Sequence, residues 1–180
     1  MSLLTHDELI VLVEEGVIQN CYTNQVNAAS IDITLGYTVW IEDLADTVVD
    51  LAAKETPNMK SINIAGSGYD LAPGAFILAS SREVFNLPNN IAAEYKLKSS
   101  LARAGLDHLN AGWADPGWHG SVLTLELHNV LRLHTLRLRP GMKIGQMVFF
   151  RGEPVPAHAS YAVRGAYNGD KIATPSKGVR

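Results

Sequence analysis

The chain has 180 residues, of which 47% are hydrophobic and 18% charged, so it can bury the core of one globular domain. Its net charge of −3 gives no general attraction to nucleic acid or to an anionic membrane surface. The single cysteine, Cys21, excludes an intrachain disulfide framework and a multi-cysteine metal site. With no long apolar run and no signal-peptide pattern, we expect a cytoplasmic protein that binds neither nucleic acid nor membranes.

The first predicted element is a short N-terminal helix. Thr5 and Glu8 have the spacing of a capping box, and apolar side chains recur between Leu9 and Val13. Gly16 can end the helix, because glycine readily adopts the left-handed backbone that closes a helix. This is the clearest helix signal in the chain.

From residue 29 onward the sequence is typical of β-strands. Short apolar or alternating runs are separated by glycine, proline and asparagine; the runs are SIDITLG, YTVWIE, AFILASS, HTLRLRP and KIGQMVFF. This pattern predicts a mainly β domain built as a jelly-roll-like sandwich or barrel. We place the single domain in residues 1–160.

Residues 161–180 are predicted to form an extended C-terminal arm. This part of the chain is rich in proline, glycine, alanine and serine and offers too few large apolar side chains to build a core. Such an arm can still fold over the domain and close its active site.

One predicted strand, SVLTLELHN at 121–129, carries a carboxylate inside an apolar run. Because strand side chains alternate between two faces, Leu125 and Leu127 face one way while Thr124 and Glu126 face the other. Taken alone, this pattern fits a strand whose second face is simply wet. A functional interpretation of Glu126 therefore depends on the segments around it.

The upstream segment LKSSLARAGL brings two cations and two hydroxyl groups together; they belong to Lys98, Ser99, Ser100 and Arg103. Lysine and arginine supply charge-assisted hydrogen bonds, and serine hydroxyls and backbone N–H groups add neutral ones. The group therefore suits a phosphate. A short polar helix or turn at the surface explains the same residues equally well.

The next segment, NAGWADPGWHG, predicts a tight turn that begins at Asp115. Glycines and aromatic residues on both sides are typical of a hairpin that lines a small-molecule pocket. Trp118 can stack on a sugar or base, and Asp115 can accept a hydrogen bond from a sugar hydroxyl. The alternatives are that Trp118 belongs to the core and that Asp115 only caps the turn.

Together these segments resemble a known family. The order and close spacing of KSSLARAGL, AGWADPGWHG, LTLELHN and PGMKIGQMVFF are similar to those of the dCTP deaminase branch of the dUTPase-like superfamily, and the likeness extends to NAASIDITLG and AYNGDKIATPSKG. The resemblance implies a distorted β-barrel or jelly roll of the dUTPase-like type, assembled as a homotrimer with active sites at subunit interfaces. It also implies conversion of dCTP to dUTP, or onward to dUMP, without zinc, while Mg²⁺ accompanies the triphosphate.

The resemblance also implies roles for individual residues. Glu126 matches the catalytic glutamate, Ser99 and Arg103 match the catalytic serine and arginine, and the backbone of Ala111 is expected to contact the reacting water. The positions expected to contact the nucleotide are Lys98, Ser99, Ser100, Arg103, Asp115, Trp118, Thr124, Leu125, Gln146 and Tyr161.

Two arm positions depart from the family pattern. Ala166 stands where the family has a phosphate-binding lysine, and Asp170 stands where it has a glutamine. Lys171 or Arg164 could supply the missing cation, and we include Lys171 among the expected substrate-binding residues. The alternative is a preference for a nucleotide with fewer phosphates.

Cytosine deamination needs a water that attacks C4 and a group that carries protons to the ring nitrogen and the leaving amine. A carboxylate sheltered from water can have a pKa near neutrality, which suits both tasks. Zinc deaminases use H-x-E and P-C-x-x-C motifs instead; here the HDE triplet at His6 opens a predicted helix, so we expect no metal site. His108 is the one histidine that we expect near the site, in a structural role.

Three alternatives stay open at this point. One is a dUTPase-like pyrophosphatase, because Asp115 stands where that branch positions its hydrolytic water; the others are a dCMP deaminase and a non-catalytic nucleotide-binding regulator. Glu126 favours deamination, and its combination with Ser99 and Arg103 argues against a regulator.

Overall fold

The structure is a computed structural model, which describes residues 1–43 and 48–178. The strands are β1 Ser2–Leu3, β2 Ile18–Gln19, β3 Ile31–Glu42, β4 Met59–Asn63, β5 Tyr69–Leu71, β6 Phe76–Asn86, β7 Ile91–Leu97, β8 Leu106–His108, β9 Trp113–Ala114, β10 His119–Asn129, β11 Leu136–Leu138 and β12 Lys143–Arg151. The helices are α1 His6–Glu14, α2 Ser99–Arg103 and α3 Tyr161–Arg164, with 3-10 turns at Thr23–Gln25 and Ala157–Ala159.

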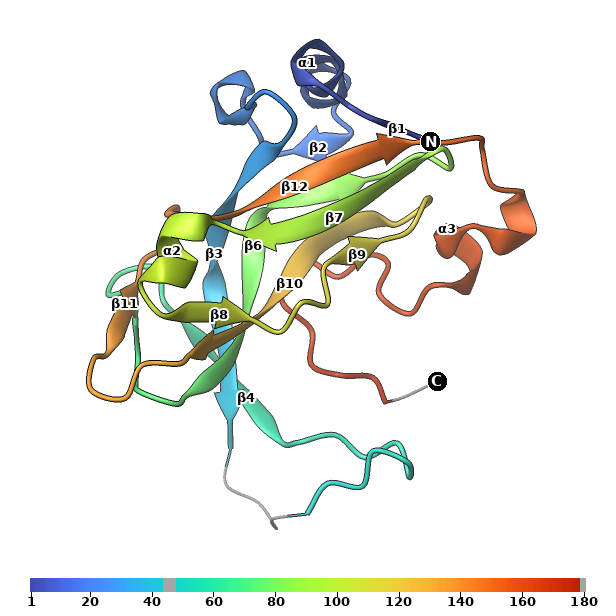
Figure 1. The fold of residues 1–180 in the computed structure, drawn as a ribbon. Coiled ribbons are helices and arrows are strands. Elements are labelled where there is room, and N and C mark those ends of the chain that lie inside the picture. Colours follow the sequence, from blue (N-terminus) through green and yellow to red (C-terminus); the bar gives the residue numbers. More distant parts are fainter. Residues whose placement is uncertain (44–47, 179–180) are drawn as a thin grey trace.

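The centre of the molecule is a curled antiparallel sheet (Figure 1). Neighbours along it are β8, β10, β6, β3, β12, β7 and β9, while β1 pairs with β12, β2 with β6 and β4 with β3. Strands β5 and β11 form a separate small sheet. The predicted mainly β fold with few helices is therefore confirmed.

The predicted helix corresponds to α1. The backbone N–H of Thr5 donates to Oε2 of Glu8 at 3.3 Å, as expected for a capping box, and Gly16 has a φ of +73° just after the helix. Leu9 and Leu12 are buried against the sheet. The helix therefore covers one end of the core.

The strand runs differ from their prediction in two places. SIDITLG and YTVWIE form one long strand, β3, because its pairing with β6 shifts register between Leu35 and Val39 without ending the strand. HTLRLRP contributes only the short strand β11, which pairs with β5 instead of joining the main sheet. Local patterns predict that a strand forms, whereas its length depends on the partner strand.

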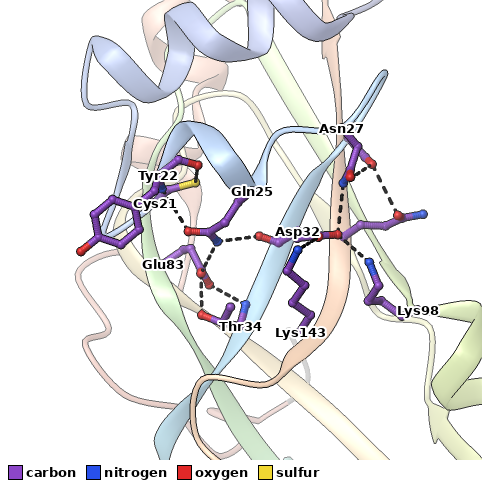
Figure 2. A network of polar contacts seen from close by, with 11 residues as sticks. Cys21, Tyr22, Gln25, Asn27, Asp32, Thr34, Glu83, Lys98 and Lys143 are labelled. Carbon is purple, nitrogen blue, oxygen red and sulfur yellow. Dashed lines mark hydrogen bonds and ion pairs between the residues drawn. The ribbon is translucent and has the colours of Figure 1, made fainter.

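A fully buried carboxylate, Glu83, fixes β3 against β6 (Figure 2). Its Oε1 accepts hydrogen bonds from Gln25 Nε2 at 2.9 Å and from Thr34 Oγ1 at 2.7 Å. Its Oε2 accepts one from the backbone N–H of Thr34 at 3.0 Å. Because a buried carboxylate is costly without such partners, the network favours this one arrangement of the two strands.

Strand β10 lies between β6 and β8, and its side chains alternate as predicted. Leu125 and Leu127 are fully buried in the core, whereas Thr124 and Glu126 are only partly buried. Glu126 is opposite Leu78 of β6. No helix in the described part of the chain is long and apolar enough to cross a membrane.

Candidate active site

A pocket of about 480 Å³ opens beside β10. It is formed by the 111–118 hairpin, by β10, by the C-terminal arm and by apolar side chains around β4 and β6. Its lining residues are Pro57, Met59, Phe76, Leu78, Ala111, Trp113, Ala114, Asp115, Trp118, Val122, Leu123, Thr124, Glu126, Tyr161, Tyr167, Asp170, Thr174 and Ser176. The pocket thus contains carboxylates and aromatic rings but no lysine or arginine among the described lining residues.

Glu126 is the carboxylate that β10 presents to this pocket. Its side chain is 22% exposed, and its Oε2 lies 3.1 Å from Nε2 of His108 on β8, whose side chain is 5% exposed. The two atoms are close enough for an ion pair but are not aligned as a hydrogen bond, since neither has a hydrogen-bond partner among the described residues. His108, expected to be structural, therefore contacts the predicted catalytic group.

For the hairpin residues Trp118 and Asp115, the sequence left open a role in packing and a role in lining a pocket, and the structure shows both. Trp118 is buried and stacks on Phe85 with 5.3 Å between ring centroids, yet it also lines the pocket. Asp115 lines the pocket as well, and its Oδ1 accepts a hydrogen bond from Trp113 Nε1 at 2.9 Å. Packing and pocket formation are thus combined in the same side chains.

The arm lies along β10 of its own chain (Figure 1). The backbone N–H of Val122 donates to the carbonyl of Asp170 at 2.8 Å, and that of Thr174 donates to Oγ1 of Thr124 at 3.2 Å. Trp118 Nε1 donates to the carbonyl of Tyr167 at 2.8 Å. These bonds make the arm one wall of the pocket, while its last two residues lie outside the described part of the chain.

Lys177 connects the two arm positions that depart from the family pattern. Its Nζ donates to the carbonyl of Ala166 at 2.8 Å and to Oδ2 of Asp170 at 3.0 Å, and it lies 4.8 Å from the ring centroid of Tyr167. Lys171, the expected replacement for the missing cation, instead donates to the carbonyl of Gly120 and lines a different pocket. Lys177, which sequence reasoning missed, is therefore a cation that contacts both altered positions.

A second polar region lies between β3, β7 and β12, and we call it the lysine cluster: Asp32, Lys98 and Lys143 (Figure 2). Oδ1 of Asp32 accepts from Lys98 Nζ at 2.6 Å and from Asn27 Nδ2 at 3.1 Å, and its Oδ2 lies 2.7 Å from Lys143 Nζ. Burial alone would raise the pKa of Asp32, but the hydrogen bonds from Lys143 and Lys98 hold this pKa below its ordinary value. The carboxylate therefore stays charged and keeps both ammonium groups in place.

Several predicted site residues lie in or beside this second region. Gln146 is opposite Asp32 in the β12–β3 pairing, and Lys98 immediately precedes α2, where Ser99, Ser100 and Arg103 are exposed. None of these residues lines the pocket that contains Glu126. The side chain of Leu125, also expected to contact the nucleotide, is fully buried, which leaves only its backbone for such a contact.

The predicted site residues therefore form two groups on one chain. The first group lines the pocket and consists of Glu126, Ala111, Asp115, Trp118, Thr124 and Tyr161. The second group lies around α2 and the lysine cluster and consists of Lys98, Ser99, Ser100, Arg103 and Gln146. Within residues 1–43 and 48–178, no group of three or more His, Cys, Asp or Glu side chains is arranged to hold a metal ion.

Sequence comparisons place this chain among nucleotide enzymes. The family described as dCTP deaminase-like matches residues 3–152. A protein of Nocardioides sp. named dCTP deaminase, dUMP-forming, is 37% identical, and the alignment covers 97% of this chain and 94% of that protein. A protein of the same name from Acidothermus cellulolyticus is 39% identical, with 84% and 81% covered.

Solved structures support the same fold. The crystal structure of the 2′-deoxycytidine 5′-triphosphate deaminase of Agrobacterium tumefaciens has a TM-score of 0.65 at 20% identity; the match covers 83% of this chain and 48% of that chain, so the present chain spans about half of its length. A mutant dUTPase from phage phi11 of S. aureus, described with a structural Mg(II) ion, has a TM-score of 0.51 at 13% identity, with 77% and 86% covered. With its family match and its long alignments to relatives, this chain belongs to the dCTP deaminase-like family and has the dUTPase-like fold.

Proposed function

We propose that the chain deaminates dCTP, with Glu126 as general acid and base, and carries the dUTP onward to dUMP. The observation that carries this proposal is the position of Glu126, a partly exposed carboxylate at the wall of a 480 Å³ pocket whose other walls are the hairpin and the arm. The names of the relatives support dCTP as the substrate and dUMP as the product. Asp115 in the same pocket supports the second hydrolysis.

The deamination step balances with one water and one carboxylate. Glu126 accepts a proton from the water while the oxygen of that water bonds to C4 of cytosine. The C4–N3 π electrons move to N3, and Glu126 passes the proton to N3. Glu126 then receives the proton of the new C4 hydroxyl and delivers it to the exocyclic amine. The C4–N bond breaks, ammonia leaves and the C4 carbonyl of uracil forms.

The phosphate end of dCTP needs cations that the Glu126 pocket does not offer among its described lining residues. The lysine cluster, Ser99, Ser100 and Arg103 supply them, and a neighbouring copy of the chain in a homotrimer brings them to the pocket. Mg²⁺ accompanies the triphosphate as its counterion and belongs to the substrate.

Product analysis tests this proposal. The protein is incubated separately with dCTP, dCMP and dUTP, and ammonia, pyrophosphate and nucleotides are followed with time. We expect ammonia, pyrophosphate and dUMP from dCTP. Ammonia from dCMP alone would mean a monophosphate deaminase, pyrophosphate from dUTP without ammonia from dCTP would mean a pyrophosphatase, and binding without turnover would mean a regulator.

A metal assay tests the chemistry separately. We expect deamination to persist after transition metals are removed and their absence is verified by elemental analysis, provided that Mg²⁺ is returned with the nucleotide. Tightly bound stoichiometric zinc, with deamination lost on its removal and restored on its return, would contradict a glutamate-only mechanism.

A further inference from the structure

Four buried side-chain polar atoms have no hydrogen-bond partner among the described residues. One is Nε1 of Trp40; the other three, Oη of Tyr95, Nε2 of His108 and Oε2 of Glu126, belong to side chains that lie next to one another. A buried polar group without a partner is unfavourable, and native proteins hold few of them. Nε2 of His108 lies 3.1 Å from Oε2 of Glu126, and the ring of Tyr95 packs against that of His108, so the three side chains form one group that includes the predicted catalytic carboxylate.

The imidazole of His108 has a defined orientation. The backbone N–H of Asn110 donates to its Nδ1 at 3.1 Å, which is possible because Asn110 has a φ of +65° and turns the chain back toward the ring. Because Nδ1 accepts a hydrogen bond, the proton of the neutral ring is on Nε2. His108 therefore presents an N–H group toward Oε2 of Glu126, 3.1 Å away.

Tyr95, on β7, carries a second buried hydrogen-bond donor without a partner among the described residues. Its ring is 1% exposed and lies 4.6 Å from the ring of His108, at an interplanar angle of 50°. The ring fits because Gly145 lacks a side chain, since a Cβ at that position would overlap the phenol. Burial, together with the negative charge of Glu126, raises the pKa of Tyr95, so its hydroxyl keeps its proton.

We propose that Tyr95 and His108 are positioning residues that donate to Oε2 of Glu126 when nucleotide is bound. This inference rests on the proposed role of Glu126. Catalytic hydrogen bonds are often poorly aligned without substrate and tighten in the complex. Because Oε2 is buried, the exposed surface of Glu126 belongs to its other atoms, which face the pocket.

The arrangement determines which oxygen of Glu126 handles the proton. Once both groups donate to Oε2 in the complex, that oxygen holds negative charge and does not take the proton. Oε1 takes the proton from water and returns it, so the proton stays on the substrate side during both transfers. Two donors also fix the carboxylate rotamer, which matters because a misplacement of about 1 Å can cost roughly 100-fold in rate.

The test is Tyr95→Phe, which keeps the ring and removes only the hydroxyl. We expect the single-turnover rate of deamination to fall by about tenfold to 100-fold, with the Kd for dCTP and the Tm nearly unchanged, since no hydrogen bond to a described residue is lost. Tyr69→Phe, a half-buried tyrosine on β5 outside the pocket, is the matched control. A changed Tm with an unchanged rate would mean that Tyr95 only packs.

Two further comparisons make the result specific. In a Glu126→Gln background, Tyr95→Phe should cause no additional loss, because positioning acts through the carboxylate. His108→Gln, which offers an amide N–H, should retain more activity than His108→Leu. If Glu126→Gln is inactive while Tyr95→Phe and His108→Leu are fully active, this inference is wrong and the proposed function stands; if Glu126→Gln is active, the proposed mechanism itself is wrong.

Discussion

The pocket around Glu126 and the lysine cluster are opposite in charge. The described lining of the pocket has three carboxylates, those of Asp115, Glu126 and Asp170, and no cation. The lysine cluster has two ammonium groups around one buried carboxylate. A nucleoside triphosphate also has two unlike ends. Its flat base is nearly neutral and needs no cation, whereas its phosphates carry several negative charges that the ammonium groups of the lysine cluster can bind.

The separation of the two regions indicates how the site is assembled. Figure 1 shows α2, next to Lys98, on one side of the sheet and α3, where the arm begins, on the other. The proposed trimer would bring the two regions together, since each pocket would then receive base-binding residues from one chain and phosphate-binding residues from another. The comparison predicts that changes in the two regions have different kinetic effects.

Glu126→Gln should have the largest effect. The variant removes the charge with little change in volume, so the rate of deamination should fall by about 10²- to 10⁴-fold. The Kd for dCTP should change little, because the proposed function places the phosphates on the lysine cluster and α2. Single-turnover rates and nucleotide titrations measure the two quantities, and Glu153→Gln, an exposed glutamate, is the control. Normal deamination by Glu126→Gln would mean that Glu126 is only a polar residue on the solvent-exposed face of the sheet.

Lys98→Gln should affect binding instead of chemistry. Loss of one charge-assisted contact should weaken dCTP by about tenfold to 100-fold and leave deoxycytidine binding unchanged. The Kd values of deoxycytidine, dCMP and dCTP measure this dependence on phosphate number. Lys60→Gln, which removes an exposed lysine paired with Asp43, is the control. Equal weakening of all three ligands would contradict the division between the two regions.

Removal of residues 161–180 should have an intermediate effect, because the arm forms one wall of the pocket. We expect KM for dCTP to rise by at least about tenfold, the equivalent of roughly 1.4 kcal/mol of lost contact, while the trimer stays intact. Steady-state kinetics and sedimentation velocity measure these properties. Unchanged turnover by the truncated chain would show that the arm does not act as a lid.

The smallest expected effect concerns acid stability. Since the folded-state pKa of Asp32 is below the value near 3.8 of a free aspartate, this carboxylate stabilises the fold above about pH 4 and the contribution is lost as the pH falls through the lower folded-state pKa. Between pH 7 and pH 3, the Tm of wild type should therefore fall more than that of Asp32→Asn. The exposed Asp7→Asn is the control, and parallel Tm curves for wild type and Asp32→Asn would contradict the prediction.

Local patterns predicted much of the fold and part of the site. The period of two in residues 121–129 was enough to separate the core-facing Leu125 from Glu126, because alternation is a property of the strand itself. The contact between Lys98 and Asp32 joins residues 66 positions apart and depends on the order of β3, β12 and β7, which no local pattern contains. The same holds for His108 beside Glu126, since it requires the pairing of β8 with β10.

The hydrogen bond between Trp118 and the arm has an optical consequence. The indole is 7% exposed, and its N–H is bonded to the carbonyl of Tyr167, so its surroundings depend on whether the arm is docked. Release of the arm would let water reach the ring and shift its fluorescence to longer wavelength. The chain has two other tryptophans, and Trp40, which does not line the pocket, can be replaced by phenylalanine to reduce the background. Stopped-flow emission would then report arm opening during turnover. Comparison with the rate of ammonia release would reveal whether deamination or arm opening limits the rate of turnover.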